Sequence, residues 1–422
     1  MLHLVLAYWL NGNLAMAQQV LLETSEISRR AGHIYIAHFS MYMLAVLQTM
    51  QGHLHEAHTI YLQALQPAAQ TANEFGSTSV QTASKEWSTQ GQSKQPSPAT
   101  SVVHLGLANL LYEWNDLDAA AYHLSTSIEL GQHIGDFRLL PFSYFALARL
   151  KLSQGDRDGA CELTRKGEHA LQQYRYGQSM SQQEAYRIEL YIALGNIEEA
   201  TRLAQGCHAN VDDTPAQSYE AEHRAMARLF IARKQTDAAI ALLHHQLQAA
   251  ESEGRIWNVI KLLVLQALAL QEQGHAAQAV SVLARALSLA EAEGFVRTFV
   301  DEGKPMVALL SEVLAAQQKN SALYPVSPEY VHTLLAALGV HAQPELSHND
   351  AQISLHTLVE PLSEREVEIL RLIAAGMSNQ EITEKLIIAM STLKTHINHL
   401  YAKLDVHSRT QAIVRARALN LL

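Results

Sequence analysis

Residues 362–404 read LSEREVEILRLIAAGMSNQEITEKLIIAMSTLKTHINHLYAKL, and local chemistry predicts that this stretch folds as short helices. Ser363 and Glu366 have the spacing of a capping box, in which the hydroxyl accepts a hydrogen bond from the N3 amide and the carboxylate reaches back. The same spacing recurs in Ser378 with Glu381 and in Ser408 with Gln411. Gly376 stands where the first helix must end in a left-handed turn.

Apolar residues then recur at helical spacing in four rows, each of which gives one buried face. The rows are Val367, Leu370, Ile373 and Ala374; Ile382 and Leu386; Leu393, Ile397, Leu400 and Leu404; and Ile413, Ala416 and Leu419. Two short helices joined by a tight turn, with polar residues exposed on the second, form helix-turn-helix geometry. The sequence therefore predicts four short helices, of which the third is presented as a DNA-reading helix.

The charge of this region agrees with that interpretation. From Lys385 to Leu422 there are six Lys or Arg against one acid, Asp405, whereas the whole chain has a net charge of −10. A basic patch on an acidic protein is an electrostatic footprint for phosphate. By itself such a cluster is more often a solvated helix face, but together with the caps and the turn it indicates DNA binding.

Residues 359–422 resemble the LuxR-type helix-turn-helix of bacterial transcription regulators over the whole module. The resemblance implies that the third helix enters the major groove of double-stranded DNA, where Lys394, Thr395 and Asn398 face base edges. It places five further residues near the phosphate backbone: Asn379, Thr392, His396, Lys403 and Arg409. Because a single short module contacts few phosphates, we expect a homodimer on paired half-sites of a (pseudo)palindromic operator.

The three base-reading positions carry suitable chemistry. Lys394 can donate to guanine O6 and N7, the Thr395 methyl can touch a thymine methyl, and Asn398 can read adenine. One position departs from the family, which usually has Ser or a similar cap where this chain has Ala389. An Ala cap costs about 1 kcal/mol relative to Ser or Asp. Either Ser391 takes over the cap two residues later, or the start of the reader helix frays.

A second pattern fills the chain before residue 341. A small or turn-prone residue is followed five positions later by Ala, in pairs that are 40, 63, 40, 40, 39 and 40 residues apart. The pairs are Gly12/Ala17, Gly52/Ala57, Asn115/Ala120, Gly155/Ala160, Gly195/Ala200, Lys234/Ala239 and Gly274/Ala279. The residue seven positions upstream of the turn residue is Ala in most repeats. In the other two repeats it is Val5 and Ile188. The pattern predicts helical hairpins that stack, because one hairpin cannot bury its apolar stripe alone.

These hairpins resemble tetratricopeptide repeats, although their period exceeds the usual ~34 residues. We expect the repeats to cover 1–68 and 102–340, with a flexible polar insertion over 69–101 and a linker over 341–358 before the module at 359–422. Lys234 replaces Gly at one turn, so that turn should be strained. An effector or peptide is expected to bind on the concave face of the superhelix.

The run Gly294–Gly303, with the 40-residue repeat, resembles the C-terminal part of large ATP-dependent LuxR-family regulators, the class that includes the maltose-regulon activator. In that class a nucleotide-binding domain precedes a sensor superhelix, and inducer plus ATP drive self-association and DNA binding. This sequence contains no Gly-x-x-x-x-Gly-Lys-Ser/Thr phosphate loop, so we expect no ATP or other cofactor in this chain. It leaves open whether residue 1 is an internal start, the edge of a fragment, or the start of a partner of a separate ATPase.

Composition and motif spacing narrow the classes of protein to which this chain can belong. No apolar run of 18 residues occurs, so no membrane span is indicated. Cys161 and Cys207 are expected to be buried small residues in a reducing cytoplasm. The 22 His lack Cys or acidic residues at a strong ligand spacing, and no Gly-x-Ser-x-Gly elbow frames a nucleophile, so neither a metal site nor an enzyme is expected.

We therefore predict an all-α protein, with a tetratricopeptide-like superhelix followed by a four-helix helix-turn-helix domain. Its expected function is DNA-binding transcription regulation, with the superhelix sensing an unknown small-molecule or protein effector and RNA polymerase as a further partner. The alternative is a helical-repeat scaffold or adaptor whose DNA module is weak or vestigial. Salt dependence separates the two, because a working module loses DNA affinity steeply as salt rises.

Overall fold

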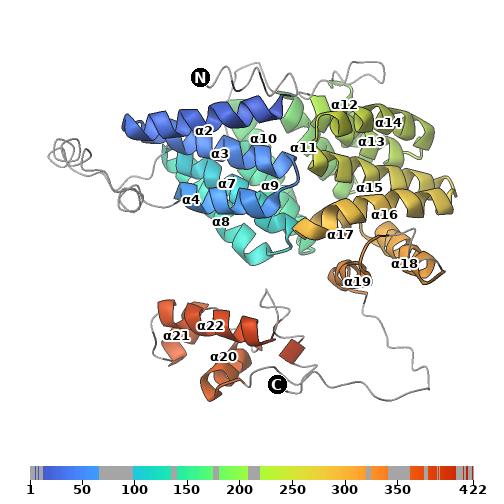
Figure 1. Ribbon diagram of the computed structural model, residues 1–422. Coiled ribbons are helices and arrows are strands. Elements are labelled where there is room, and N and C mark those ends of the chain that lie inside the picture. The colour runs from blue at the N-terminus through green and yellow to red at the C-terminus, as the bar shows by residue number, and fades with distance from the viewer. Residues whose placement is uncertain are drawn as a thin grey trace, which may run out of the picture. The chain divides into compact units, whose positions relative to one another are not determined.

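A computed structural model of the chain describes residues 5, 8, 13–65, 98–134, 140–173, 180–207, 219–319, 325–340, 362–374, 379–386, 388, 390–404, 412, 415–416 and 421. These residues form helices and turns and contain no strand, which confirms the predicted all-α fold. The chain divides into two compact units, residues 1–342 and 343–422 (Figure 1). No helix in the described ranges is both long and apolar enough to cross a membrane.

The first unit is an array of helices that pack mainly on their neighbours in sequence, as expected of stacked hairpins. Its helices are α2 (Leu14–Arg30), α3 (Ile34–Met50), α4 (Leu54–Leu65), α7 (Pro98–Glu113), α8 (Leu117–Ile134), α9 (Leu140–Ser153), α10 (Arg157–Gln173), α11 (Met180–Ala193), α12 (Ile197–Ala204), α13 (Glu220–Ala232), α14 (Thr236–Ser252), α15 (Ile256–Glu272), α16 (Ala276–Ala290), the 3-10 turn η2 (Glu291–Glu293), α17 (Arg297–Val300), α18 (Lys304–Lys319) and α19 (Pro328–Ala337). Of residues 1–12, where the first predicted hairpin begins, the structure describes only residues 5 and 8.

The hairpin turns form where the repeat pattern predicted them. The six predicted turn residues that the structure describes all have left-handed φ angles: Gly52 (88°), Asn115 (62°), Gly155 (81°), Gly195 (78°), Lys234 (59°) and Gly274 (81°). After each turn the chain closes back on the first helix, as in the hydrogen bond of 2.9 Å from His53 N to Gln48 O. A second set of left-handed turns, at Gly32, Gly254 and Gly294, lies between hairpins, and the sequence pattern did not predict it.

The small residues of the pattern lie at the helix–helix contacts. The Ala that follows each predicted turn is 0% exposed in all seven repeats, and the upstream Ala, Val5 or Ile188 is at most 1% exposed. Small side chains at these positions let the two helices of a hairpin approach closely, so the repeat signature is a packing signature. The predicted superhelix of helical hairpins is therefore confirmed.

Lys234 is the turn residue for which the sequence predicted strain, and its φ of 59° lies in the left-handed region that side chains other than Gly and Asn avoid. Its ion pair with Glu272 (3.2 Å) is exposed, with side chains 81% and 46% accessible, and contributes little. We expect Lys234→Gly to stabilise the superhelix by roughly 1 kcal/mol, measured by thermal unfolding. Gly274→Lys, the reverse change at the equivalent turn, should destabilise it, and a neutral result for both would show that these turns are unstrained.

The expectations for the insertion, the linker and the two cysteines fare differently. Most of the predicted insertion over 69–101 lies outside the described residues, but α7 begins at Pro98, so its last four residues are helical; Pro is favoured at the first helical position. The linker over 341–358 also lies outside them. The expectation that both cysteines are buried was wrong, because Cys161 is exposed and Cys207 only half-buried.

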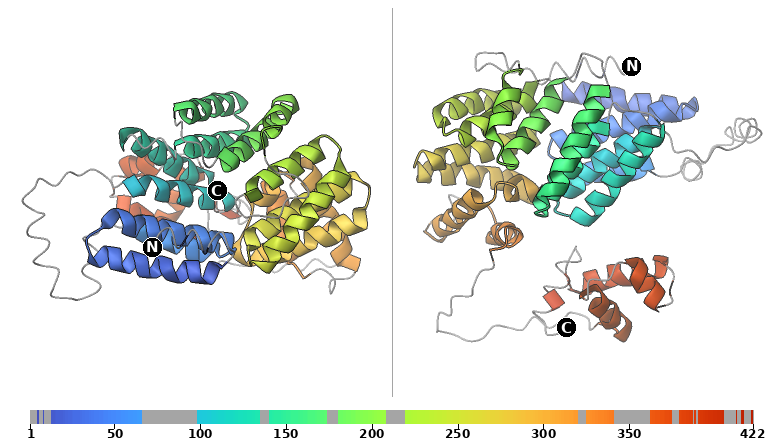
Figure 2. Two further views of the ribbon diagram at one scale, coloured as in Figure 1. Left: turned by 90° about the horizontal axis from the view of Figure 1, so that it is seen from above. Right: turned by 180° about the vertical axis from the view of Figure 1, so that it is seen from behind.

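The superhelix brings its first repeats beside its last ones. In the view from above, α3 and α4 lie next to α15 and α16, and α3 packs against α15 (Figure 2). A Cβ at Gly52 would lie 3.1 Å from Ile256 Cβ, so this turn requires Gly for its space as well as its φ. His55 N donates to Glu293 Oε2 at 3.0 Å. Helices far apart in sequence are thus joined, which a one-dimensional stack would not do.

The second unit consists of α20 (Glu364–Ala374), α21 (Asn379–Leu386), α22 (Met390–Leu404) and helical residues near its end. Its buried core is made by Ile369, Leu370, Ile373, Ile382, Leu393, Ile397, Leu400, Leu404, Ala412 and Ala416. The predicted row on the third helix is therefore buried as expected. Of the predicted fourth helix, the structure describes only Ala412, Arg415 and Ala416, all helical.

Candidate functional site

The predicted capping box at the start of α20 forms and is tied to α22. Ser363 N and Oγ both donate to Glu366 Oε2, at 2.7 and 2.9 Å, and Glu366 N donates to Ser363 Oγ at 3.3 Å. Lys403 Nζ donates to the same carboxylate oxygen at 3.0 Å. Burial alone would raise the pKa of Glu366, but the hydrogen bonds from Ser363 and Lys403 outweigh it and lower that pKa. The carboxylate therefore fixes the end of α22 against the start of α20.

A second polar contact holds α21 in place. Arg365 Nη2 donates to the backbone oxygen of Leu386, the last residue of α21, at 3.1 Å, and Nη1 pairs with Glu368 at 2.6 Å. This contact gives a free carbonyl at a helix C-terminus a cationic partner. Arg365 was not predicted as a functional residue, because a cation on an amphipathic helix gives no signal of a partner twenty-one residues away.

The residues expected to contact DNA lie mostly on α22. Lys394, Thr395 and Asn398 belong to this helix, at positions that helical spacing places away from its buried row. Of the residues expected at phosphates, Thr392 is exposed and His396 half-buried on α22. Asn379 is the first residue of α21. Arg409, Ala389, Ser378 and Ser408 lie outside the described residues.

Lys403 is placed differently from a purely exposed phosphate ligand. Its side chain is 20% exposed and its ammonium pairs with Glu366, whose side chain is 5% exposed. A phosphate contact by Lys403 would therefore be shared with this ion pair or would replace it.

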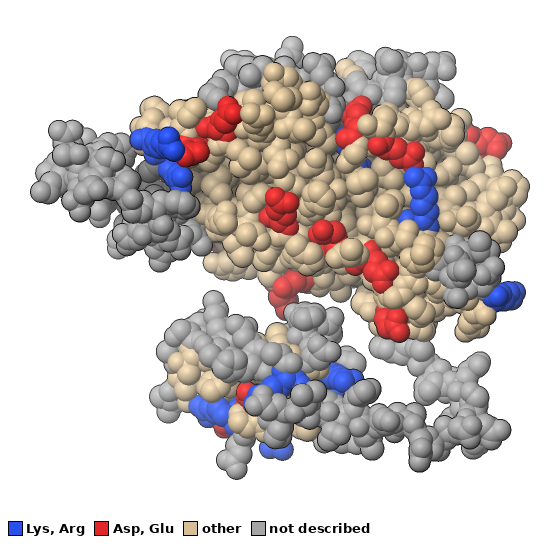
Figure 3. Space-filling model, in the orientation of Figure 1, with Lys and Arg blue, Asp and Glu red and all other residues tan. Residues whose placement is uncertain are grey.

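Across the view in Figure 3, acidic side chains are scattered over the superhelix, whereas Lys and Arg prevail on the described surface of the second unit.

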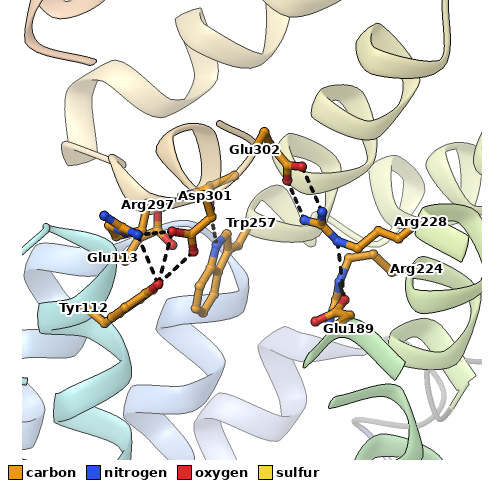
Figure 4. Close-up of polar contacts among 10 residues, drawn as sticks. Tyr112, Glu113, Glu189, Arg224, Arg228, Trp257, Arg297, Asp301 and Glu302 are labelled. Carbon is orange, nitrogen blue, oxygen red and sulfur yellow. Dashed lines mark hydrogen bonds and ion pairs between the residues drawn. The ribbon is translucent and has the colours of Figure 1, made fainter. Parts of the chain in front are cut away.

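The superhelix contains a set of charged side chains, here called the charged cluster. They lie where the first helices of successive hairpins line up side by side. Its members come from α7, α9, α11, α13, α15 and the segment around α17: Glu113, Arg149, Glu189, Arg224, Arg228, Lys261, Arg297, Asp301 and Glu302. Seven of them are drawn in Figure 4 with Tyr112 and Trp257. They bring together residues up to 189 positions apart in the sequence, since Tyr112 contacts Asp301.

Segment 294–303 carries one side of this cluster, docking against α7. Tyr112 OH donates to both oxygens of Asp301, at 2.9 and 3.1 Å, and Arg297 pairs with the same carboxylate (Figure 4). Glu113 accepts from Thr298 N at 2.8 Å through its side chain. Burial raises the pKa of Glu113 above its usual range, although Lys261 and the Thr298 hydrogen bonds oppose this shift. The segment thus closes the superhelix with directed polar contacts.

The other side of segment 294–303 docks against α13. Arg228 donates from Nη1 and Nη2 to the two oxygens of Glu302, at 2.9 and 2.5 Å, which is the bidentate geometry of a strong ion pair. Arg224 Nε donates to Glu189 at 3.2 Å, and Arg228 Nε lies 3.7 Å from the same oxygen. Burial would raise the pKa of Glu189, but Arg224 and Arg228 outweigh it and lower that pKa.

The run Gly294–Gly303 was noticed in the sequence, but none of these contacts was predicted from it. One signal was present. Asn109, Arg149, Glu189 and Arg228 each follow the upstream buried residue of their repeat, at steps of 40, 40 and 39 residues. Polar residues that recur at one repeat position indicate a shared polar surface.

The described residues contain no group of three or more His, Cys, Asp or Glu side chains that could hold a metal ion.

Two family models match the sequence. One describes the MalT-like TPR region and matches residues 80–316, which is more than half of the chain; the other describes bacterial regulatory proteins of the luxR family and matches residues 360–416. This chain belongs to the MalT-like TPR family. The resemblance expected from the sequence is therefore confirmed for both parts.

Curated relatives agree with this family. The HTH-type transcriptional regulator MalT of Vibrio cholerae serotype O1 is 25% identical over 324 residues, and that of Cronobacter sakazakii is 27% identical over 329 residues. In both cases the match covers 74% of this chain but only 35% of the relative. The chain therefore spans about a third of the length of the curated relatives that it matches.

Proposed function

We propose that this chain is a DNA-binding transcription regulator that acts in the cytoplasm and has no catalytic role of its own. The observation that carries the proposal is the second unit, where α21 and α22 pack on a common core within a match to the luxR family. The Ser363–Glu366–Lys403 contacts fix α22, as a reader helix requires. The relatives named as HTH-type transcriptional regulators support the same function.

In this proposal α22 enters the major groove. Lys394, Thr395 and Asn398 read base edges there, and operator halves related by two-fold symmetry bind a homodimer. Contacts to phosphates come from Asn379, Thr392, His396, Lys403 and Arg409, with Lys403 shared between phosphate and Glu366. The superhelix senses an effector or partner and sets the affinity for DNA, with RNA polymerase as the target of the bound regulator.

The decisive prediction concerns Lys394. In the full chain, Lys394→Ala should weaken binding to the selected operator by about 1–3 kcal/mol, or roughly 5- to 150-fold, because a base contact is lost. The operator is first selected from genomic DNA with the purified wild-type chain, and affinity is then measured by fluorescence anisotropy over a range of salt concentrations.

Arg371→Ala is the matched control, since it removes one exposed cation from α20 of the same unit. It should retain specificity and lose little affinity. Equal affinities of the two variants for the operator would remove Lys394 from the reader role. A wild-type chain that enriches no sequence, and whose DNA binding lacks a steep salt dependence, would favour the scaffold alternative instead.

A further inference from the structure

Two cations of the charged cluster have no carboxylate in contact among the residues that the structure describes. Lys261 Nζ lies 3.7 Å from the centre of the Trp257 ring, and among the described residues it forms no ion pair. Arg149 donates from Nη2 to Asn109 at 3.2 Å and stacks on Tyr112 at 4.2 Å, and in the same described set its Nε is buried with no hydrogen-bond partner. A cation in a largely dehydrated site is costly unless an anion compensates it.

The other charged side chains of the cluster already have a hydrogen-bond or ion-pair partner. Arg228 is held by Glu302, Arg224 by Glu189, and Arg297 by Asp301, while Glu113 accepts from the backbone of segment 294–303. Glu220 of α13 also acts electrostatically on Lys261 and Arg224, but its carboxylate is paired with Arg255. Lys261 and Arg149 are also half-buried rather than sealed, so solvent reaches both side chains.

From this geometry we propose that Lys261 and Arg149 bind the carboxylate of a small organic monoanion on the inner side of the superhelix. The half-buried ring of Trp257, which already contacts Lys261, offers apolar surface for the organic part, while the buried ring of Tyr112 packs against Arg149. One carboxylate supplies the partner that both cations lack, and the apolar ring favours an organic anion over inorganic phosphate. The inference deepens the proposed function, on which its regulatory meaning rests, by naming the class of effector.

The electrostatics of Lys261 give this site a measurable signature. Burial lowers the pKa of Lys261 to about 7, and the nearby Arg224 and Arg149 lower it too, against the opposing effect of Glu113 and Glu189. At neutral pH the free chain therefore holds this amine about half protonated. A bound carboxylate stabilises the charged form, so binding takes up protons, and the affinity falls as the pH rises above 7.

Isothermal titration calorimetry of the full chain tests the proposal, with sodium acetate, sodium lactate and sodium phosphate as probes at pH 7. Titrations in HEPES and in Tris, which differ in ionisation enthalpy, measure the protons exchanged. We expect a carboxylate probe to bind with uptake of up to about half a proton per site. Lys261→Met should remove that uptake and weaken binding about tenfold or more, the effect of one lost charge-assisted hydrogen bond.

Arg149→Met should weaken binding similarly, and because Arg149 lowers the pKa of Lys261, its removal should raise that pKa and reduce the proton uptake without abolishing it. Lys319→Met, which removes an exposed lysine in the last turn of α18, is the matched control and should bind like the wild type. Far-ultraviolet circular dichroism shows that each variant is folded before titration.

Four results would overturn the proposal: no carboxylate binding, binding without proton uptake, unchanged binding in Lys261→Met, or phosphate binding more tightly than both carboxylates. Unchanged binding in the variant would move the site elsewhere, for example to the open cavity of about 390 Å³ lined by Tyr144, Arg165 and His169. None of these measurements uses DNA, so their failure is distinguishable from failure of the DNA-binding proposal.

Discussion

Replacement of Glu302 by Ala should lower the free energy of unfolding of the superhelix by about 3 kcal/mol, because it leaves Arg228 without its bidentate partner. The side chains of Glu302 and Arg228 are 7% and 28% exposed, so water cannot fully replace the lost carboxylate. The expected cost lies at the lower end of the range for a broken buried pair, since Glu189 still lies 3.7 Å from Arg228 Nε.

Urea unfolding followed by circular dichroism measures this cost. The matched control is Glu312→Ala, which removes an exposed glutamate from the neighbouring α18 and should change stability by less than about 0.5 kcal/mol. In the double variant Arg228→Met/Glu302→Ala no buried guanidinium is left unpaired, so much of the stability should return. If Glu302→Ala and Glu312→Ala were equally mild, segment 294–303 would not be held by this ion pair.

The sequence predicted the features that depend on neighbouring residues. The turn at Lys234, the buried Ala residues of the hairpins and the capping box of Ser363 with Glu366 all rest on local backbone and packing chemistry, and the structure confirms each of them. Repeat periodicity also fixed which face of each helix is buried. These features follow from one hairpin or one helix end at a time.

The contacts that close the superhelix could not be predicted in that way. The hydrogen bond from Tyr112 to Asp301 depends on the cumulative curvature of the array, which periodicity leaves undetermined. A repeat signature fixes the contacts between neighbours but is silent about the first and last repeats. The error at Cys161 has a local cause instead: this residue follows the buried Ala160 on the same helix, so helical spacing places it on the exposed side.

The charged cluster could be predicted from the sequence only in part. The recurrence of Asn109, Arg149, Glu189 and Arg228 at one repeat position was visible in the sequence and indicates a shared polar surface. Which cations would find carboxylates was not visible, since Glu302 comes from outside the repeats. That difference separates Arg228, which has a carboxylate partner, from Lys261, which has none in contact within the described chain and to which we assign a ligand.

A second large effect is expected in the DNA-binding unit, where Leu400→Ala should cost about 2–5 kcal/mol of its stability. Leu400 is 0% exposed in a core of few buried side chains, and a domain of this size has a small margin of stability. The variant should therefore populate an opened second unit and lose operator binding, because only the folded fraction can bind.

Amide hydrogen exchange of the full chain separates this outcome from the loss of a contact. In Leu400→Ala, exchange should rise across residues 362–404, whereas peptides of the superhelix should exchange as in the wild type, since the two units are separately compact. Leu372→Ala, at a half-buried position of the same unit, should show roughly half the effect or less.

Lys394→Ala should lose operator affinity with no change in exchange, since in the proposed function it removes a contact to a base rather than a core side chain. The two variants thus give opposite patterns for the same loss of binding. Exchange that rose equally in the superhelix of Leu400→Ala would show that the stability of the sensor depends on the DNA-binding unit. In that case effector and DNA affinities would be coupled through folding as well as through assembly, and the coupling would have to be reciprocal.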